Sequence, residues 1–419
     1  MIITFLDIVL FSTYFVLLFL TIFWLLILFT PQPTPTRNTH RKPLFSVIVP
    51  AYNEQESIEQ TLLSITKLRY PTNLLQIIIV NDGSKDQTQE IVQTFIQQHP
   101  QHNITILTQS NSGKGRALNH GLEHATGEFF ACLDADSFVG ENALETMLPL
   151  FEEQDVAAVC PVLKVRKPTT MLEKVQWSEY IINMFYKFLN AKIDCIHVTP
   201  GPFSIYRTAL IKKLGGFSEK TITEDLEMAI RLQKHNYRIL QSFDSIVETV
   251  VPTTWKTLFR QRVRWYKGSV DNTLAYKELI FNKKYGDFGM IRMPTIIASG
   301  VIVLTLSTAL LQSFIKKIYT SYLSLSAVHF DIITLLKHYT IEFNPLTLPF
   351  FKITIAATVT ILSFAIMIMS FKLIKEKITN YGKTWTSLFT YFFIYGLFLT
   401  TVWLYIAYMF IKKKKNFWH

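Results

Sequence analysis

The sequence predicts an α/β domain with a mainly parallel sheet, flanked by transmembrane helices, and three observations support this prediction. Long apolar runs lie toward both ends of the chain, at a length that suits a bilayer. Between them, short β-branched runs alternate with segments of helical periodicity. Polar residues follow directly after several of these predicted strands.

The composition points to a membrane protein. The chain has 419 residues, of which 49% are hydrophobic and 14% aromatic, and its formal net charge is +11. No zinc-finger spacing or RNA-binding signature accompanies the positive charge, so we expect contact with membrane lipid and no nucleic-acid partner. Cys132, Cys160 and Cys195 all fall in the predicted soluble part, where reduced structural thiols are expected.

Four segments are predicted to cross the membrane, namely 2–30, 294–314, 348–374 and 386–411. The first is too long for a cleaved signal peptide and lacks a basic start, so we expect a permanent anchor. Residues 319–345 carry several titratable side chains and are expected to form an extracytoplasmic amphipathic stretch instead of a fifth span.

Basic residues set the predicted orientation. They cluster after the first span, before the second and between the last two, and positive loops stay in the cytoplasm. We therefore expect a multi-pass protein of the cell membrane whose middle region is cytoplasmic and whose amino terminus is outside. The tail KKKK at 412–415 disagrees, because four spans leave it outside and a fifth would bring it in.

These patterns divide the chain into five predicted parts. They are an N-terminal transmembrane helix (1–30), a linker (31–43), a cytoplasmic domain (44–252), interfacial amphipathic helices that contain QRVRW (253–285), and a C-terminal membrane domain with about three transmembrane helices (286–419). In the cytoplasmic domain the predicted strands lie at 45–53, 75–84, 103–109 and 127–136, and the predicted helices at 54–68, 85–99 and 115–125.

Candidate site residues stand where these strands end. Glu54 follows the first strand, Asp82 the second, and Asp134 and Asp136 the fourth. A solvated turn uses the same residue types, so it is their coincidence at the ligand-binding edge of the sheet that indicates a site. Asp134 and Asp136 project to one side of an extended chain, and such a pair suits Mg2+ or Mn2+ bound to phosphate oxygens. A solvated strand end is the alternative interpretation.

A second candidate region follows the irregular, turn-rich stretch TPGPFSIYR at 199–207. TITEDLEMAIRL predicts a helix that is capped by Thr223 or Thr221 and has Glu224 and Asp225 at its positive end. Capping alone explains these residues structurally. The unusual stretch upstream favours a functional role as well.

VPAYNE, DGS, DAD, GPFSIYR, GGF, TED and QRVRW, in this order, resemble the motifs of membrane-integrated family 2 glycosyltransferases. That family includes the poly-N-acetylglucosamine, hyaluronan, chitin and cellulose synthases. The resemblance covers residues 44–270 motif by motif. It implies a GT-A (Rossmann-like) fold, a UDP-sugar donor, a divalent metal ion and inversion at the anomeric carbon.

The resemblance also implies roles for individual residues. The donor side comprises Tyr52, Glu54, Asp82, Lys114, Asp134 and Asp136. The first three of these would surround the uridine, the lysine would contact the nucleotide, and the last two would hold UDP and the metal. The acceptor side comprises Asp225 as the general base, with Glu224 beside it, and Gly201, Pro202, Tyr206 and Arg207 near the acceptor end.

The QRVRW stretch at 261–265 has its own physical logic. At helical spacing Gln261, Arg264 and Trp265 fall on one side, while Arg262 turns away. Arg264 can grip a diphosphate with two parallel hydrogen bonds, and Trp265 offers a face on which a sugar ring can stack. A basic amphipathic helix on the membrane surface is the structural alternative.

The predicted function is inverting transfer from a UDP-sugar to a growing polysaccharide at the membrane by a processive enzyme, and the expected donor is UDP-N-acetylglucosamine. Transfer of one sugar to a lipid-linked acceptor is the first alternative, and the size of the product distinguishes the two. A non-enzymatic transporter or scaffold is the second alternative. An accessory subunit is a further partner to consider.

Overall fold

The computed structural model describes residues 5–30, 41–331, 333, 350–382 and 384–412. The chain divides into two compact units. One comprises Met1–Leu28 and Ala298–Ile368, and the other comprises Phe29–Ile297 and Met369–His419. The second unit holds the sheet and every candidate site residue, and it is described first.

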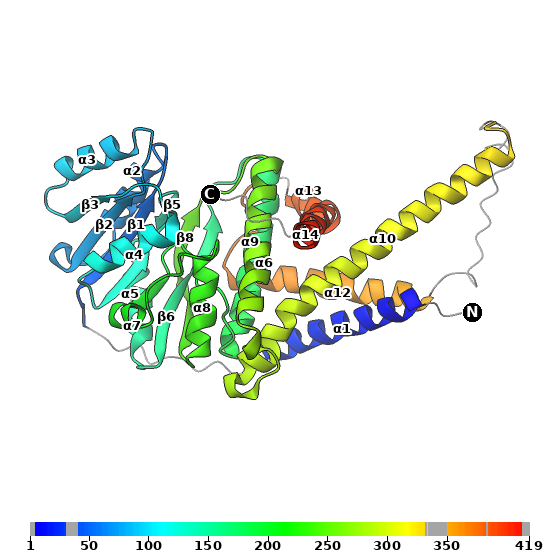
Figure 1. The fold of residues 1–419 in the computed structure, drawn as a ribbon, viewed down its shortest axis with the longest axis horizontal. Helices are drawn as coiled ribbons and strands as arrows, with labels where there is room; N and C mark the ends of the chain where they lie inside the picture. The colour runs from blue at the N-terminus through cyan, green and yellow to red at the C-terminus, as the bar shows by residue number, and fades with distance from the viewer. Residues whose placement is uncertain (1–4, 31–40, 332, 334–349, 383, 413–419) are drawn as a thin grey trace. The chain divides into compact units, whose positions relative to one another are not determined.

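The described residues of this unit form an eight-stranded sheet (Figure 1). The strands, in the order in which they lie side by side, are β3 (Asn103–Thr108), β2 (Leu75–Asn81), β1 (Phe45–Ala51), β4 (Phe129–Cys132), β7 (Ile205–Arg207), β6 (Val156–Val165), β8 (Arg238–Thr249) and β5 (Ser137–Val139). Strands β1 to β4 are parallel to one another, and so are β6 and β8. Strand β7 is antiparallel to both neighbours, and β5 is antiparallel to β8. The predicted mainly parallel sheet is therefore confirmed.

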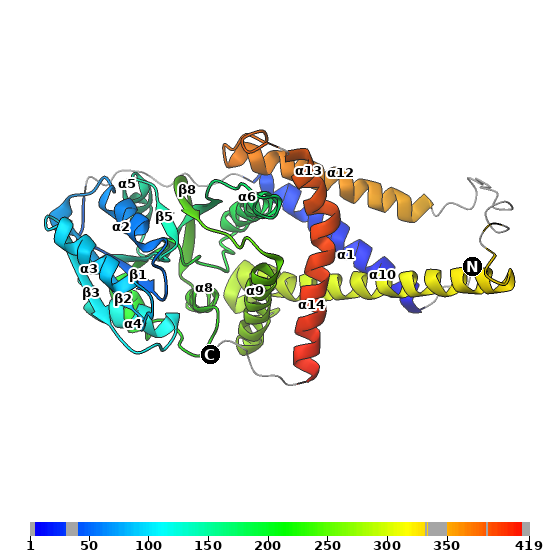
Figure 2. The same ribbon diagram turned by 90° about the horizontal axis from the view of Figure 1, so that it is seen from above.

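Both faces of the sheet are covered, which explains the continuous apolar runs in the sequence. Val47, Ile48 and Val49 of β1 are all fully buried although they alternate in direction. Helices α2 (Ile58–Thr66) and α4 (Lys114–His124) lie on opposite faces (Figure 2).

The remaining regular elements follow along the chain. They are α3 (Thr88–Gln98), α5 (Ala143–Met147), α6 (Met171–Lys192), α7 (Thr208–Lys213), α8 (Glu224–Lys234), α9 (Trp255–Ala275) and the short 3-10 turns η1 (Thr72–Leu74), η2 (Leu148–Phe151), η3 (Lys277–Leu279) and η4 (Lys283–Tyr285). Helix α6 begins with a capping box formed by Thr170 and Glu173. The three cysteines are buried and form no disulfide.

Four helices in the described residues are long and apolar enough to cross a membrane, as predicted. They contain α1 (Phe5–Leu28), the π-helical turn η5 (Phe288–Arg292) with α10 (Met293–Ala327), α12 (Phe350–Leu373), and a run of α13 (Thr384–Phe389), the π-helical η7 (Thr390–Tyr395) and α14 (Gly396–Ile411). The first part of the predicted amphipathic stretch, up to residue 327, continues α10. Residues 334–349 and most of the KKKK tail lie outside the described residues.

The last candidate span packs within the same unit as the sheet. Tyr395 packs against Leu172 and Leu258, and Val402 and Ile406 pack against Val263. Helix α9 therefore lies between α8 and α14 (Figure 2). The predicted membrane domain, 286–419, is thus divided between the two compact units. Its C-terminal part belongs to the unit that holds the sheet, because these apolar contacts join it to α6 and α9.

Candidate active site

The end of β4 and the beginnings of α4 and α8 bring opposite charges together at one edge of the sheet. Strands β1, β2 and β4 are parallel, so the residues that follow them lie at the same edge. Lys114, the first residue of α4, places its Nζ 2.5 Å from Asp134 Oδ1 and 3.3 Å from Glu224 Oε1. Burial lowers the pKa of Lys114, but the carboxylates of Asp134, Glu224 and Asp225 more than offset this and raise it overall. The lysine is therefore a fixed cation among acidic side chains.

Gly201 allows the chain to pass close to this ion pair. A Cβ atom at Gly201 would lie 2.8 Å from Lys114 Nζ and 3.1 Å from either carboxylate oxygen of Asp134. The turn is fixed to the end of β4, because the backbone N–H of Phe203 donates to the carbonyl of Cys132 over 2.6 Å. Pro202 lies between these two anchors and is buried. Gly201, one of the four residues expected near the acceptor, thus borders the charged site, and Pro202 follows it in the same turn.

Negative charge exceeds positive charge on the donor side. Burial and the charges of Asp134 and Glu54 together raise the pKa of Asp136 to about 7, although Lys114 opposes this rise. Burial likewise raises the pKa of Glu54, and although a hydrogen bond from Ser57 opposes this, Asp134 adds to it. The site can therefore accept additional positive charge.

A divalent cation fits this charge imbalance only in part. Among the described residues, no three His, Cys, Asp or Glu side chains gather closely enough to hold a metal ion without further ligands. Asp134 and Asp136 could supply two oxygens, which leaves room for diphosphate oxygens and water in the ligand shell of Mg2+ or Mn2+. The donor set is thus of the right chemistry for a metal that arrives with its substrate.

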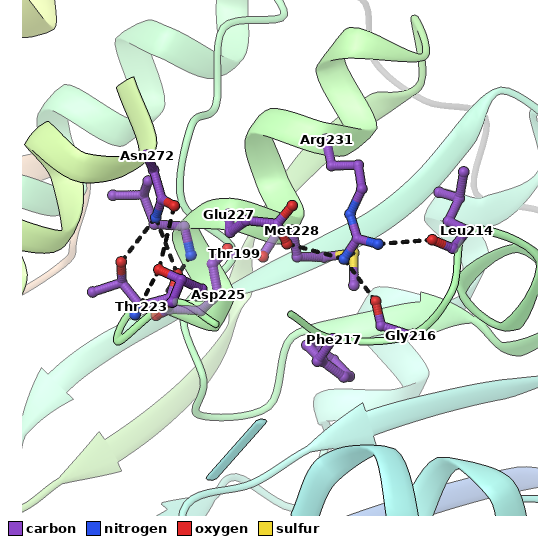
Figure 3. Close-up of polar contacts among 12 residues, drawn as sticks. Thr199, Leu214, Gly216, Phe217, Thr223, Asp225, Glu227, Met228, Arg231 and Asn272 are labelled. Carbon is purple, nitrogen blue, oxygen red and sulfur yellow. Dashed lines mark hydrogen bonds and ion pairs between the residues drawn. The ribbon is translucent and has the colours of Figure 1, made fainter. Parts of the chain in front are cut away.

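Asp225 has the properties of a general base. It is the second residue of α8, and its Oδ1 accepts a hydrogen bond of 2.8 Å from the backbone N–H of Leu226. Thr199 Oγ1 donates to the carbonyl of Asp225 over 2.8 Å and so ties the start of α8 to the TPGPF turn (Figure 3). Burial raises the pKa of Asp225 to about 6, with a further contribution from Glu224. A carboxylate with this pKa is ionised at neutral pH and still basic enough to take a proton.

The start of α8 is held by α9 and is not capped as the sequence predicted. Thr223 occupies the N-cap position but makes no side-chain cap hydrogen bond. Instead Thr223 Oγ1 accepts from Asn272 Nδ2 over 2.9 Å (Figure 3). Thr221 Oγ1 also donates to Asn272 Oδ1 over 3.2 Å. A Cβ atom at Gly268 would collide with Thr223. Tertiary packing thus replaces the local cap, because α9 brings an amide to the same hydroxyl.

The GGF motif is held by α8 as well. Arg231 Nη1 donates to the carbonyl of Leu214 over 2.7 Å, and Arg231 Nη2 donates to the carbonyl of Gly216 over 2.6 Å (Figure 3). Arg231 also forms an ion pair with Glu227 one turn before it. This part of the motif pattern is therefore structural and fixes the orientation of α8.

The predicted face of the QRVRW helix points toward the start of α8. Gln261, Trp265, Gly268 and Asn272 recur at helical spacing, and the last two contact Thr223. Arg264 lies one turn before Gly268 and is exposed. Gln261, Arg264 and Trp265 thus share the side of α9 on which Gly268 and Asn272 contact the start of α8.

Arg262 does not turn away from the other motif residues, which corrects the prediction. Its side chain is fully buried, and its Nη2 lies 2.5 Å from Glu179 Oε2 of α6. Arg262 Nη1 donates to Gln261 Oε1, and the guanidinium lies 4.2 Å from the ring centroid of Trp265. Helical spacing places Cβ atoms only, and the long side chain of Arg262 bends back across the motif.

The uridine-side candidates occupy two different environments. Tyr52 is 42% exposed at the end of β1. Asp82 is buried, and its carboxylate accepts from Gln109 Nε2 over 2.8 Å and from the backbone N–H groups of Ser112 and Gly113 over 2.9 Å each. Asp82 therefore organises the loop that leads into Lys114.

The structure does not bring Arg207 to this site, whereas the side chain of Tyr206 reaches its border and forms a hydrogen bond with Thr199, which holds Asp225. Strand β7 runs antiparallel to β4, so these residues lie beside the beginning of β4 and not its end. Tyr206 is buried and stacks on Phe130 with ring centroids 5.3 Å apart. Arg207 donates to the carbonyls of Val156, Phe151 and Glu153. The strand direction therefore carries Arg207 away from the site, while the ring of Tyr206 packs in the core and its hydroxyl reaches Thr199.

Three site residues were missed from the sequence. Thr199 anchors Asp225, Asn272 anchors Thr223, and Glu179 pairs with Arg262. Asn272 lies on the same helical face as Gln261, so the spacing contained a signal for it. Thr199 and Glu179 act through contacts distant in the sequence, which spacing does not reveal.

Comparison with known proteins agrees with this geometry. Residues 46–215 match the family described as Glycosyl transferase family 2. A poly-beta-1,6-N-acetyl-D-glucosamine synthase of Staphylococcus epidermidis is 33% identical over 226 residues, which are 53% of this chain and 54% of the synthase. The probable glycosyltransferase YdaM of Bacillus subtilis is 30% identical over 269 residues, which are 60% of this chain and 61% of that protein. The match thus spans somewhat more than half the length of these relatives.

A solved structure extends the likeness to most of the fold. The mannosyltransferase PcManGT of Pyrobaculum calidifontis, solved with GDP-Man and Mn2+, superimposes with a TM-score of 0.62. The match covers 87% of this chain and 96% of the mannosyltransferase at 21% sequence identity. This likeness establishes the GT-A fold for the sheet and its covering helices.

Proposed function

We propose, from the premise that residues 46–215 form a family 2 glycosyltransferase domain, that this enzyme transfers N-acetylglucosamine from its UDP donor to the end of a growing polysaccharide at the membrane. The observation that carries the proposal is the junction of Lys114, Asp134 and Glu224 at the edge of the sheet, with Asp225 next to it on α8. This junction joins a nucleotide-binding strand end to a base of suitable pKa. The synthase from Staphylococcus epidermidis supports the choice of sugar.

Asp225 is the proposed base of the transfer. An acceptor hydroxyl attacks the anomeric carbon of the donor, the bond from that carbon to the UDP oxygen breaks, and the hydroxyl proton passes to an Asp225 oxygen. A positioned base of this kind contributes about 10²–10⁴-fold to the rate. Glu224 is paired with Lys114, which leaves Asp225 as the base. Direct displacement by the acceptor inverts the anomeric centre.

The donor side would hold the nucleotide and its leaving group. Tyr52, Glu54 and Asp82 are the proposed uridine contacts, and Lys114 places a permanent cation beside the diphosphate. A divalent ion held by Asp134 and Asp136 would stabilise charge on the departing diphosphate. Arg264, which is exposed on α9, would add two hydrogen bonds to the same group.

The membrane arrangement supports a polymer product. Helix α9 carries the acceptor-side residues, and η5 with α10, a candidate span, follows shortly after it in the chain. The basic loops favour a cytoplasmic catalytic domain, which is where nucleotide sugars would reach it. We therefore propose that the acceptor end lies at the entrance to the membrane and that the enzyme is processive.

A donor panel tests the proposal. Membranes that contain the enzyme are incubated with Mn2+ and radiolabelled UDP-N-acetylglucosamine, UDP-glucose, UDP-galactose or GDP-mannose, and the products are sized. Polymer from UDP-N-acetylglucosamine alone is the expected result. A lipid extract that carries a single labelled sugar would contradict polymerisation and support transfer of one sugar to a lipid-linked acceptor. Turnover of GDP-mannose alone would contradict the proposal that UDP-N-acetylglucosamine is the donor.

A further inference from the structure

We infer that Arg262 is a positioning residue for the acceptor side, through which Glu179 and Tyr395 fix the orientation of Gln261 and Trp265. The inference rests on the proposed function, in which the QRVRW helix meets the acceptor. The Arg262 network comprises Arg262, Glu179, Tyr395, Gln261 and Trp265. Its members come from α6, α9 and the π-helical η7 of the last candidate span.

Each nitrogen of the Arg262 guanidinium serves a different partner. Arg262 Nε donates to Tyr395 Oη over 3.0 Å, Nη2 pairs with Glu179, and Nη1 donates to Gln261 Oε1. The planar guanidinium presents these donors in fixed directions, whereas a lysine carries a single nitrogen at the end of a flexible stem. Only arginine can therefore hold all three partners at once.

The charged part of the network is closed upon itself. Tyr395 Oη donates to Glu179 Oε2 over 2.9 Å, so Arg262, Glu179 and Tyr395 form a hydrogen-bonded triangle. Their exposed fractions are 0%, 5% and 1%. A buried charge without its partner is strongly unfavourable, so the triangle holds its geometry firmly.

The network constrains what Gln261 and Trp265 can offer to a substrate. Arg262 can only donate, so it turns the oxygen of the Gln261 amide toward itself and leaves the amide N–H groups to donate elsewhere. The guanidinium covers one face of the Trp265 ring at 4.2 Å, which leaves the other face for stacking. Both effects define one orientation of the motif.

The last candidate span contributes Tyr395 to the Arg262 network from a π-helical segment. Tyr395 is the final residue of the π-helical η7, and such segments shift the register of the side chains that follow. The rings of Trp255 and Phe259 in α9 contact Phe398 just beyond it, with centroids 5.2 Å and 6.3 Å apart. The position of α9 is thus tied to this span at several points, with Arg262 closest to the motif.

The test compares three network variants with a matched control in the full-length enzyme. Arg262→Lys keeps the positive charge but loses the fixed directions of the three guanidinium hydrogen-bond donors. Glu179→Gln removes the negative charge that pairs with Arg262, and Tyr395→Phe removes a single hydroxyl group. Arg260→Lys is the control, because Arg260 is an exposed arginine of the same helix and lies outside the network. Each protein is assayed for UDP binding, for transfer from the donor that the wild type uses best, and for product length.

Arg262→Lys is expected to reduce kcat/KM by at least about tenfold and to shorten the product, with UDP affinity within about twofold of wild type. Tyr395→Phe, which keeps the ion pair and should fold, is expected to shift both readouts in the same direction by about twofold to fivefold. Arg260→Lys should match the wild type.

Two results would overturn the inference. One is wild-type product length and turnover in both Tyr395→Phe and Arg262→Lys. The other is a parallel loss of UDP affinity and transfer, which indicates a general structural role. All variants are assayed with the donor on which the wild-type enzyme is most active. The test therefore remains valid if that donor is not UDP-N-acetylglucosamine.

Discussion

The strand-end site and the Arg262 network both bury charged groups, but they balance their charge differently. At the strand ends one lysine faces Glu54, Asp134, Asp136, Glu224 and Asp225, and burial with mutual repulsion raises the pKa of several of these carboxyls. In the network a single arginine meets a single glutamate, and a tyrosine bridges the two.

This difference in charge balance indicates different roles: the strand-end site is suited to bind a ligand, and the Arg262 network is suited to position its neighbours. Excess negative charge is costly in a folded protein unless a ligand or cation relieves it, so it marks the place where donor and metal are expected. A balanced, solvent-free pair requires nothing further and serves to hold its neighbours. The contrast yields predictions for each region.

The largest effect is expected at the donor carboxylates. Asp136→Asn should reduce transfer by about 10³-fold or more, because a bound metal supplies several kcal/mol of charge stabilisation. EDTA should abolish wild-type activity, and Mn2+ or Mg2+ should restore it. Full activity in EDTA would mean that the excess charge serves another purpose.

The second-largest effect is expected at Asp225, the proposed general base. Asp225→Asn should lower kcat by about 10²-fold or more while UDP binding is nearly unchanged, since only proton removal is lost. Steady-state kinetics with UDP titration measures both quantities. Unchanged turnover would move the role of base to another group, with Glu224 as the nearest candidate.

The pH profile sharpens the same assignment. The pKa of Asp225 is raised to about 6, so its basic form is complete above that pH and is lost below it. We expect kcat to fall about tenfold for each pH unit below this value and to level off above it. Glu224→Gln removes a charge that raises the pKa of Asp225, so the acid limb of any residual activity should move to lower pH.

The two arginines of QRVRW provide the most direct contrast. Arg264→Lys should reduce kcat/KM by about tenfold to a hundredfold, because lysine keeps the charge and loses the paired hydrogen bonds to diphosphate. The enzyme should remain as stable as the wild type, since Arg264 is exposed. Arg260→Lys, another exposed arginine of α9, is the control and should be nearly silent.

Arg262→Lys should behave differently in one further respect. A thermal unfolding assay in detergent should show a clear loss of stability for this variant and none for Arg264→Lys. Weakening a buried ion pair costs up to about 3–5 kcal/mol. Equal stability of the two variants would contradict the distinction between a buried and an exposed arginine.

The smallest effect is expected where α9 supports the base. Asn272→Ala removes hydrogen bonds to Thr221 and Thr223 at the start of α8. A loss of about threefold to tenfold in kcat is expected, with no change in UDP affinity. A fall in UDP affinity alone would place Asn272 on the donor side instead.

Much of the fold could be predicted because local patterns report local structure. The apolar runs and their turns located β1 to β4, and apolar length located the four candidate spans. Element ends were less accurate. The first predicted helix begins later, at Ile58, and the fourth strand ends at Cys132, before the aspartates.

The sequence by itself determined which residue types gather at the edge of the sheet, since parallel strands must end together. It also determined that Gln261, Arg264 and Trp265 share a helical face, because that follows from the helical repeat alone. Tertiary structure decided the rest. The antiparallel direction of β7 carried Arg207 away from the site. Long side chains reach partners that no spacing encodes, so only the packing of α6, α9 and η7 made Arg262 the buried arginine and left Arg264 exposed.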